Sequence, residues 1–173
     1  MSATDQTSKA RKERVDNYLR LKNEHDIRPL VDLFGKDGEL DDRGLGQTFR
    51  RHPCIHDYYT DLMRGVPDLS LEEKRRYVSD DAIIAEVIVR GTHLGDWRGL
   101  PPTGRRLEIP VCAVFTFGAD QFLGRVRIYY DRALVLKQLG VFHDPETPSG
   151  KFITMLTHPL TMADIVWRAN VGR

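Results

Sequence analysis

Apolar residues recur at helical spacing in three segments of the first third of the chain. The first segment contains Tyr18, with the long Lys22 stem at its polar edge. The second begins after Asp26, a residue type that caps helices, and continues through Phe34 to a stop at Gly35. The third shows the longest apolar stripe, formed by Ile55, Tyr58, Tyr59, Leu62 and Met63. We therefore predict three N-terminal helices, preceded by about seven disordered residues.

From Leu69 onward the apolar period changes to two, which is typical of β-strands. The clearest strand carries inward apolar residues at Leu107, Ile109, Val111, Ala113, Phe115 and Phe117. A hairpin turn at 118–121 leads to a last strand that places Leu123 on its outer face. The inward face of this strand is formed by Phe122, Gly124, Val126, Ile128 and Tyr130. Helices followed by such a meander predict an α+β fold, a cone-shaped barrel with three helices packed on a curved antiparallel sheet.

The length and composition of the chain fit one hydrophobic core. With 173 residues, of which 40% are apolar, we expect one domain over residues 8–140. Residues 141–173 form a C-terminal extension expected to pack on the domain or on a partner subunit. The formal net charge of +1 provides no field that would hold nucleic acid or a membrane surface. Without a signal-peptide pattern or an apolar run of about 18 residues, the expected location is the cytoplasm.

Motifs for metals and nucleotide cofactors are missing from the sequence. Cys54 and Cys112 belong to no metal-ligand spacing, and no glycine-rich phosphate loop occurs. We therefore expect no metal and no organic cofactor. A small hydrophobic molecule is the expected partner.

The outer face of the predicted sheet is partly apolar. It carries Cys112, Val114, Leu123 and Tyr129. Packing of this face against the same face of a second copy would remove it from water, so we predict a homodimer.

The segment from Arg90 to Gly140 combines several short motifs. They are Gly91-Thr92-His93 with Gly95 and Gly99, the Pro101-Pro102-Thr103-Gly104 loop, Asp131 after the last strand, and Gln138-Leu139-Gly140. In this combination the segment resembles the SnoaL-like polyketide cyclase family. The resemblance implies the cone fold shared with nuclear transport factor two, scytalone dehydratase and ketosteroid isomerase, in agreement with the periodicity.

The N-terminal part resembles ketosteroid isomerase across YLRLKNEHDIRPLVDLFGKDGELDD. This resemblance implies that Tyr18 supplies an oxyanion hydrogen bond and that Asp42 acts as a general base. Two positions depart from the superfamily. Ala113 stands where the isomerase has an acid and the cyclases a histidine, and Ile128 stands where aromatic-polyketide cyclases have an acid/base aspartate. Neither mechanism therefore transfers intact.

Three residues are candidates for catalysis, each with a structural alternative. Asp42, with Asp41 as the register-shifted choice, is either a desolvated base or half of a solvated turn pair. His93 continues an inward strand face and either carries protons or hydrogen-bonds a neighbouring loop, a role that the flanking glycines favour. The Tyr18 hydroxyl either polarises a carbonyl or only packs in the core.

Aromatic and inward apolar side chains are the candidates for the wall of the pocket, because they combine apolar area with polar tips. The predicted substrate-binding residues are Tyr58, Trp97, Ala113, Phe115, Ile128 and Tyr130. Asp131, which follows the last strand, is expected to cap a short helix over ALVLKQL.

Three functions fit these features. The first, which we favour, is a small-molecule acid/base enzyme, a cyclase, isomerase or dehydratase acting on a hydrophobic carbonyl or polyketide-like substrate. The second is a non-catalytic module that binds a hydrophobic ligand. The third is a structural dimer without a ligand, which a cone filled by its own side chains would support.

Overall fold

The structure, a computed structural model, describes residues 3–142. The helices in this range are α1 (Ala3–Glu24), α2 (Ile27–Asp32), α3 (Arg51–Gly65) and α4 (Arg132–Gln138). The strands are β1 (Phe34–Asp42), β2 (Gln47–Arg50), β3 (Ser70–Val78), β4 (Ala82–Thr92), β5 (Arg106–Phe117) and β6 (Leu123–Tyr129). The three predicted N-terminal helices and the predicted meander, β3 to β6, are confirmed. The proposed extension, residues 141–173, lies almost entirely outside the described residues.

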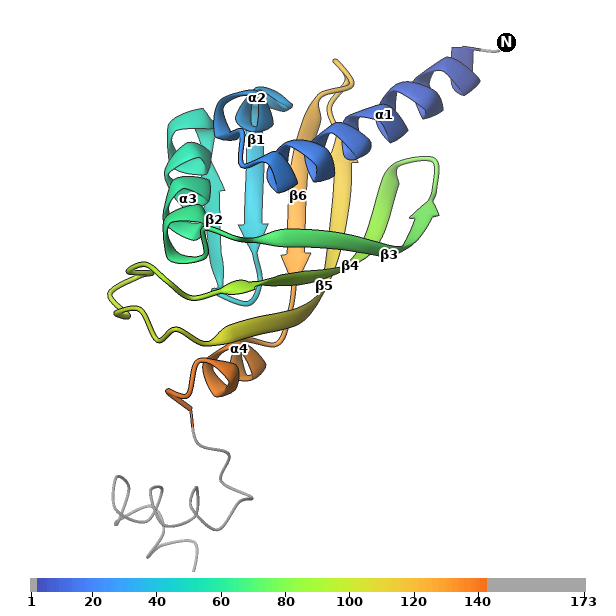
Figure 1. Cartoon of the computed structure of the whole chain (residues 1–173). Helices are drawn as coiled ribbons and strands as arrows, with labels where there is room; N and C mark the ends of the chain where they lie inside the picture. Colours follow the sequence, from blue (N-terminus) through green and yellow to red (C-terminus); the bar gives the residue numbers. More distant parts are fainter. Residues whose placement is uncertain (1–2, 143–173) are drawn as a thin grey trace, which may run out of the picture.

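The strands form one curved, unclosed sheet in the order β2-β1-β6-β5-β4-β3. Figure 1 shows α1, α2 and α3 over one face of this sheet, while α4 lies at one end, next to β5. The α+β class and the packing of three helices on a curved sheet are confirmed. This arrangement leaves space between the helices and the concave face of the sheet, where the candidate site lies.

The predicted sheet was antiparallel throughout, and one strand pair of the structure differs from that prediction. β1 runs parallel to β6, from Glu39 beside Arg125 to Asp42 beside Ile128, whereas the other strand pairs are antiparallel. β1 ends at Asp42 and β6 begins only at Leu123, so no hairpin forces them to run in opposite directions.

Strands β1 and β2 are two elements that the helical spacing of the N-terminal third did not predict. The β1 sequence, FGKDGELDD, has turn-like composition and little apolar alternation. Two apolar side chains, Phe34 and Leu40, are buried in the core, and cross-strand ion pairs join β1 to both neighbouring strands. Glu39 contacts Arg50 of β2 at 2.8 Å and Arg125 of β6 at 2.7 Å, and Asp41 contacts Arg127 of β6 at 3.0 Å. Pairing with both neighbours, and not a local pattern, explains a strand in a segment that periodicity assigns to a turn.

Two boundaries of the predicted helices were wrong. Helix α2 ends at Asp32, and Phe34 already belongs to β1. Helix α1 begins at Ala3, within the stretch predicted to be disordered. Further along the same helix, Arg11 donates to the Gln121 side chain at 3.0 Å and Arg14 stacks on the Phe122 ring, so contacts distant in sequence hold its first half against the turn before β6.

The inward face of β6 also differs from the simple alternation. The pairing register with β5 shifts between Thr116 and Phe117, which leaves Gly124 without a partner on β5. Residues before this shift therefore face the side of the sheet opposite to the one that strict alternation predicts. Leu123, predicted on the outer face, is therefore fully buried, whereas Phe122 is exposed.

A single core cluster joins the helices to the sheet. It includes Tyr18 of α1, Tyr59 of α3 and Phe115 of β5, whose rings meet edge to face. The apolar faces of the helices belong to this core. Within residues 3–142, no helix is both long and apolar enough to span a membrane.

Helix α4 covers the end of the sheet with a second apolar cluster, which includes Val135 and Leu139. Asp131 caps this helix, because its carboxylate accepts hydrogen bonds from the backbone of Ala133 at 2.8 Å and Leu134 at 3.2 Å. The predicted capping role of Asp131 is confirmed.

Candidate functional site

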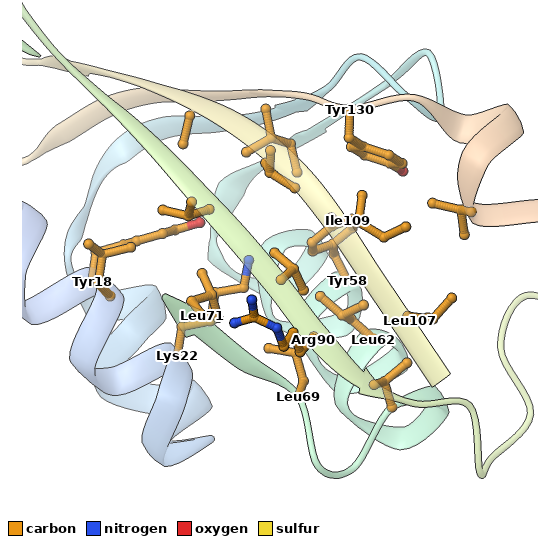
Figure 2. A pocket seen from close by; sticks show the side chains of 18 of the residues that line it. Tyr18, Lys22, Tyr58, Leu62, Leu69, Leu71, Arg90, Leu107, Ile109 and Tyr130 are labelled. Atoms are coloured by element: carbon orange, nitrogen blue, oxygen red, sulfur yellow. The ribbon is translucent and has the colours of Figure 1, made fainter. Parts of the chain in front are cut away.

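An apolar cavity lies between α1, α3 and the inner face of the sheet (Figure 2). Most of its wall is leucine, valine and isoleucine. The lining residues with polar groups are Tyr18, Lys22, Tyr58, Arg90, Trp97 and Tyr130. An apolar cavity with a few convergent polar groups is the usual form of a small-molecule site.

The cavity is small in this conformation. Its volume of about 80 Å³ accommodates several water molecules but falls below the roughly 300–1,000 Å³ of most small-molecule pockets. Arg90, whose side chain is 40% exposed, forms part of the wall. A ligand of more than a few heavy atoms therefore requires wall side chains such as Arg90 to move.

Tyr18 projects from α1 toward the cavity and is paired with Tyr59. Their hydroxyl oxygens are 2.7 Å apart, and Tyr59 does not belong to the cavity wall. Burial raises the pKa of Tyr18 to about 12, although the hydrogen bond with Tyr59 opposes this effect. When Tyr59 donates to Tyr18, the Tyr18 proton is available for an oxygen atom of a ligand.

Asp42 ends β1 and lies behind two tyrosines that line the cavity. The carboxylate is 1% exposed and accepts hydrogen bonds from the Tyr58 hydroxyl at 2.9 Å and the Tyr130 hydroxyl at 3.4 Å. Its other oxygen accepts from the Leu45 backbone at 2.9 Å. Burial, and next the negative charge of Asp42, raise the pKa values of Tyr58 and Tyr130. Asp42 therefore reaches the cavity only through these hydroxyls.

Asp41, the register-shifted alternative, points to the other side of β1. Its carboxylate forms ion pairs with Arg127 and Arg43, each at 3.0 Å. Because Asp41 is not part of the cavity wall and both partners are cationic, the geometry favours Asp42 as the acidic group of the site.

Lys22 is a cavity residue that sequence reasoning placed at the polar edge of α1. Its side chain is buried, with the residue 6% exposed, and the amine lies 5.9 Å from the Tyr18 ring centroid and 5.7 Å from that of Tyr59. Burial lowers the pKa of Lys22 to about 8, while the charge of Asp42 acts in the opposite direction. The spacing of four residues from Tyr18 was the available signal, since it puts both on one helix face.

His93 lies at the end of β4, outside the cavity wall. It is fully buried, and Nδ1 accepts a hydrogen bond from the Thr103 backbone at 3.2 Å. Burial lowers its pKa. Its backbone is bonded to Arg105 and Gly104, which anchors the loop that joins β4 to β5. This geometry favours the loop-bonding alternative, and a proton-carrying role for His93 stays a prediction.

Close packing against α3 explains a glycine beside His93. A Cβ atom at Gly95 would lie 2.1 Å from the carbonyl oxygen of Arg64, in the last turn of α3. The backbone of Gly95 instead donates to the Gly65 carbonyl at 3.1 Å. Gly95 thus holds the β4–β5 loop against α3, where Trp97 enters the cavity wall.

The structure brings most of the predicted wall residues together. Tyr58, Trp97, Ala113, Ile128 and Tyr130 line the cavity. Phe115 lies deeper, as a fully buried core residue in edge contact with Tyr18. Among the described residues, no group of three or more histidine, cysteine or acidic side chains is placed to hold a metal ion.

Comparison with solved structures finds the same fold in several proteins. A protein from Jannaschia sp. CCS1, proposed to be a SnoaL-like polyketide cyclase, has a TM-score of 0.70 at 17% identity, covering 83% of this chain and 98% of that chain. IdmH from Streptomyces antibioticus, proposed to be a polyketide cyclase, has a TM-score of 0.64 at 21% identity, covering 76% of this chain and 99% of IdmH.

A third similar structure is SalBIII, an epoxide hydrolase/cyclase-like enzyme with a role in pyran ring formation in the polyether salinomycin. It has a TM-score of 0.59 at 19% identity, covering 69% of this chain and 89% of that chain. Comparison with curated proteins finds no match. The sequence model of the family described as SnoaL-like polyketide cyclase matches residues 12–139, which is most of the chain. The chain therefore belongs to the SnoaL-like polyketide cyclase family.

Proposed function

We propose that the protein is a small-molecule acid/base enzyme of the cyclase type, acting on a hydrophobic carbonyl compound, with isomerase and dehydratase chemistry as variants of the same step. One observation carries the proposal. Tyr18 of α1, Tyr58 of α3 and Tyr130, which directly follows β6, line one apolar cavity, and a buried carboxylate, Asp42, accepts hydrogen bonds from the hydroxyls of two of them. Family membership and the cyclase descriptions of the similar proteins support this choice.

In the proposed reaction, Tyr18 and Asp42 act on neighbouring atoms of the substrate. The Tyr18 hydroxyl donates a hydrogen bond to the carbonyl oxygen and stabilises the negative charge that develops there. The proton on the adjacent carbon moves to the Tyr58 oxygen as Tyr58 passes its own proton to the Asp42 carboxylate, 2.9 Å away. The resulting enolate is the nucleophile that closes a ring or is reprotonated elsewhere.

Enolate formation is measurable without the natural substrate. We expect the protein to accelerate hydrogen–deuterium exchange at the α-carbons of 2-tetralone in D₂O, followed by proton NMR. Tyr18→Phe is expected to slow this exchange by about 100-fold, the usual effect of losing one oxyanion donor. Tyr77→Phe, which alters an exposed tyrosine away from the cavity, is the matched control and retains the full rate.

Two results would contradict the proposal: exchange no faster than in buffer, or a Tyr18→Phe variant as fast as the parent protein. Binding of 2-tetralone without exchange would favour the alternative of a non-catalytic module, because the largely apolar wall suffices to bind a hydrophobic ligand.

We also propose a homodimer formed by the outer face of the sheet. Ile84 pairs with Val114 across β4 and β5, and Cys112 pairs with Tyr129 across β5 and β6. These side chains keep partial exposure on the face opposite the helices, where a second copy would cover them.

Light scattering tests the dimer directly. We expect the mass of two 19.9 kDa chains for the parent protein and of one chain for Val114→Glu, because the new charge lies at the centre of the covered face. The control, Lys12→Glu on the exposed side of α1, stays dimeric. A parent protein with the mass of one chain would refute this assembly.

The cytoplasm is retained as the proposed location. Cys54 and Cys112 are both free thiols, one exposed and one half-buried. Free thiols persist in reducing compartments, whereas secreted proteins more often pair them in disulfides.

A further inference from the structure

Lys22 differs from Arg90, the other cationic residue of the cavity wall, because it has no ionic partner in the part of the chain that the structure describes. Arg90, the other cationic lining residue, is bound by Glu72 at 2.7 Å and Glu108 at 3.0 Å. The Lys22 amine makes no hydrogen bond or ion pair with any described residue, and it lies over the faces of Tyr18 and Tyr59. Figure 2 shows the amine and the Tyr18 hydroxyl directed from α1 into the same cavity.

An ammonium group in this position is poorly solvated. The Lys22 side chain is buried, and aromatic faces compensate only part of the lost hydration of a cation. The Asp42 carboxylate is close enough to act on Lys22 through its charge, but its oxygens are occupied by Tyr58, Tyr130 and the Leu45 backbone. The charge of Lys22 is thus incompletely balanced within the fold.

The polar groups of the wall all share one character. Tyr18, Lys22, Tyr58, Arg90, Trp97 and Tyr130 each carry hydrogen-bond donors, and no aspartate or glutamate of residues 3–142 lines the cavity. A cavity with an apolar wall, donors at its polar points and an unbalanced ammonium is complementary to a ligand with an apolar body and an anionic oxygen group.

We infer that the Lys22 amine is an anion-binding group, and that the cavity takes amphipathic carboxylates, molecules with an apolar body and one carboxylate that pairs with Lys22. The binding of carboxylates is independent of the proposed function, whereas a reaction on an acidic substrate rests on that function. A keto acid would place its carboxylate at Lys22 and its ketone oxygen at Tyr18, so that the proposed enolate chemistry acts on an acidic substrate.

Binding of octanoate and of octanamide separates charge recognition from apolar recognition, because the two ligands have nearly the same shape. Isothermal titration calorimetry at pH 7 is expected to show octanoate binding at least 10-fold more tightly than octanamide. Lys22→Met removes this preference while octanamide affinity stays within about threefold, and Lys22→Arg, which keeps the charge, retains it. The matched control is Lys12→Met, an exposed lysine of the same helix.

A pH series on the parent protein provides a second measurement that needs no variant. The rings of Tyr18 and Tyr59 face the amine, Tyr58, Tyr130 and Arg90 belong to the same cavity wall, and Asp42 acts at longer range; the pKa values of all four tyrosines are raised. Between pH 7 and pH 10 the tyrosines and Arg90 keep their protons, whereas Lys22 loses its own. Octanoate affinity is expected to fall about 10-fold or more over this range, with octanamide affinity unchanged.

Three results would overturn the inference: no preference for octanoate over octanamide in the parent protein, a preference that survives Lys22→Met, or no binding of either ligand at millimolar concentration. The exchange assay with 2-tetralone, which is uncharged, does not depend on an anion at Lys22. Loss of exchange with intact octanoate selectivity would therefore reject the proposed reaction alone, and the reverse pattern would reject the anion site alone.

Discussion

Lys22→Met is expected to stabilise the folded protein by about 3 kcal/mol at pH 7. Burial lowers the pKa of Lys22 from 10.5 to about 8, and each pH unit corresponds to about 1.4 kcal/mol. Methionine has a similar length, fits an apolar wall and needs no hydration, so the cost of burying the ammonium disappears. Most substitutions of buried residues destabilise a protein, which makes the sign of this effect diagnostic.

The gain depends on pH in a defined direction. Below pH 8, Lys22 is charged in both the folded and the unfolded chain, so the burial cost is fully present. Between pH 8 and pH 10.5 the unfolded chain binds more protons than the folded one, and the stability of the parent protein rises with pH. The difference between Lys22→Met and the parent protein should therefore shrink to near zero as pH approaches 10.5.

Urea denaturation of both proteins at pH 7 and at pH 10 measures this difference. Lys12→Met serves as the control, because Lys12 is exposed on the same helix and its replacement should change stability little at either pH. A Lys22→Met variant that is equally stable as the parent protein at pH 7, or less stable, would contradict the account of Lys22 as an uncompensated buried cation.

A destabilising lysine in a ligand cavity is understandable as a functional residue. Proteins keep groups at binding sites that lower stability when the same groups recognise a ligand. If Lys22→Met both stabilises the protein and abolishes octanoate selectivity, Lys22 is a residue that lowers stability and binds the ligand. Stabilisation without a change in selectivity would leave Lys22 as a buried cation with no binding role.

The parts of the fold predictable from sequence are those whose apolar pattern is regular. The stripe of α3 and the alternation of β4 and β5 come from side chains that face one core, so periodicity alone locates these elements. β1 was missed because most of its residues are charged or glycine, and only Phe34 and Leu40 of the strand join the core. Glu39 and Asp41 bind arginines from β2 and β6, and a pattern based on hydrophobicity does not detect such pairs.

The residues of the candidate site likewise divide into those that strand periodicity locates and those that only the tertiary structure locates. Ala113 and Ile128 were predicted on the cavity side from strand alternation, and their placement follows from that regularity. The position of Asp42 behind Tyr58 and Tyr130 depends on β1 lying parallel to β6, a long-range pairing with no local signal. Lys22 was assigned to the helix edge because lysine usually extends to water, and only the packing of α1 shows it inside the cavity.

Asp42→Ala is expected to destabilise the protein by about 3 kcal/mol or more. The carboxylate accepts hydrogen bonds from Tyr58, Tyr130 and the backbone of Leu45, and alanine leaves all three donors without their acceptor. An unsatisfied buried donor costs about 1–3 kcal/mol. The tyrosines can partly recover by bonding water in the cavity, whereas the buried volume of the lost carboxylate stays empty.

Asp42→Asn separates this structural role from the proposed role as a base. The asparagine oxygen still accepts from Leu45, and its amide donates to the oxygen of Tyr58 or Tyr130, whose hydroxyls rotate to suit. We therefore expect Asp42→Asn to unfold in urea within about 1 kcal/mol of the parent protein, since a typical hydrogen bond contributes that much, yet to lose exchange of 2-tetralone. An Asp42→Asn variant that is folded and retains full exchange would remove Asp42 from the reaction and leave it as the residue that fixes two cavity tyrosines.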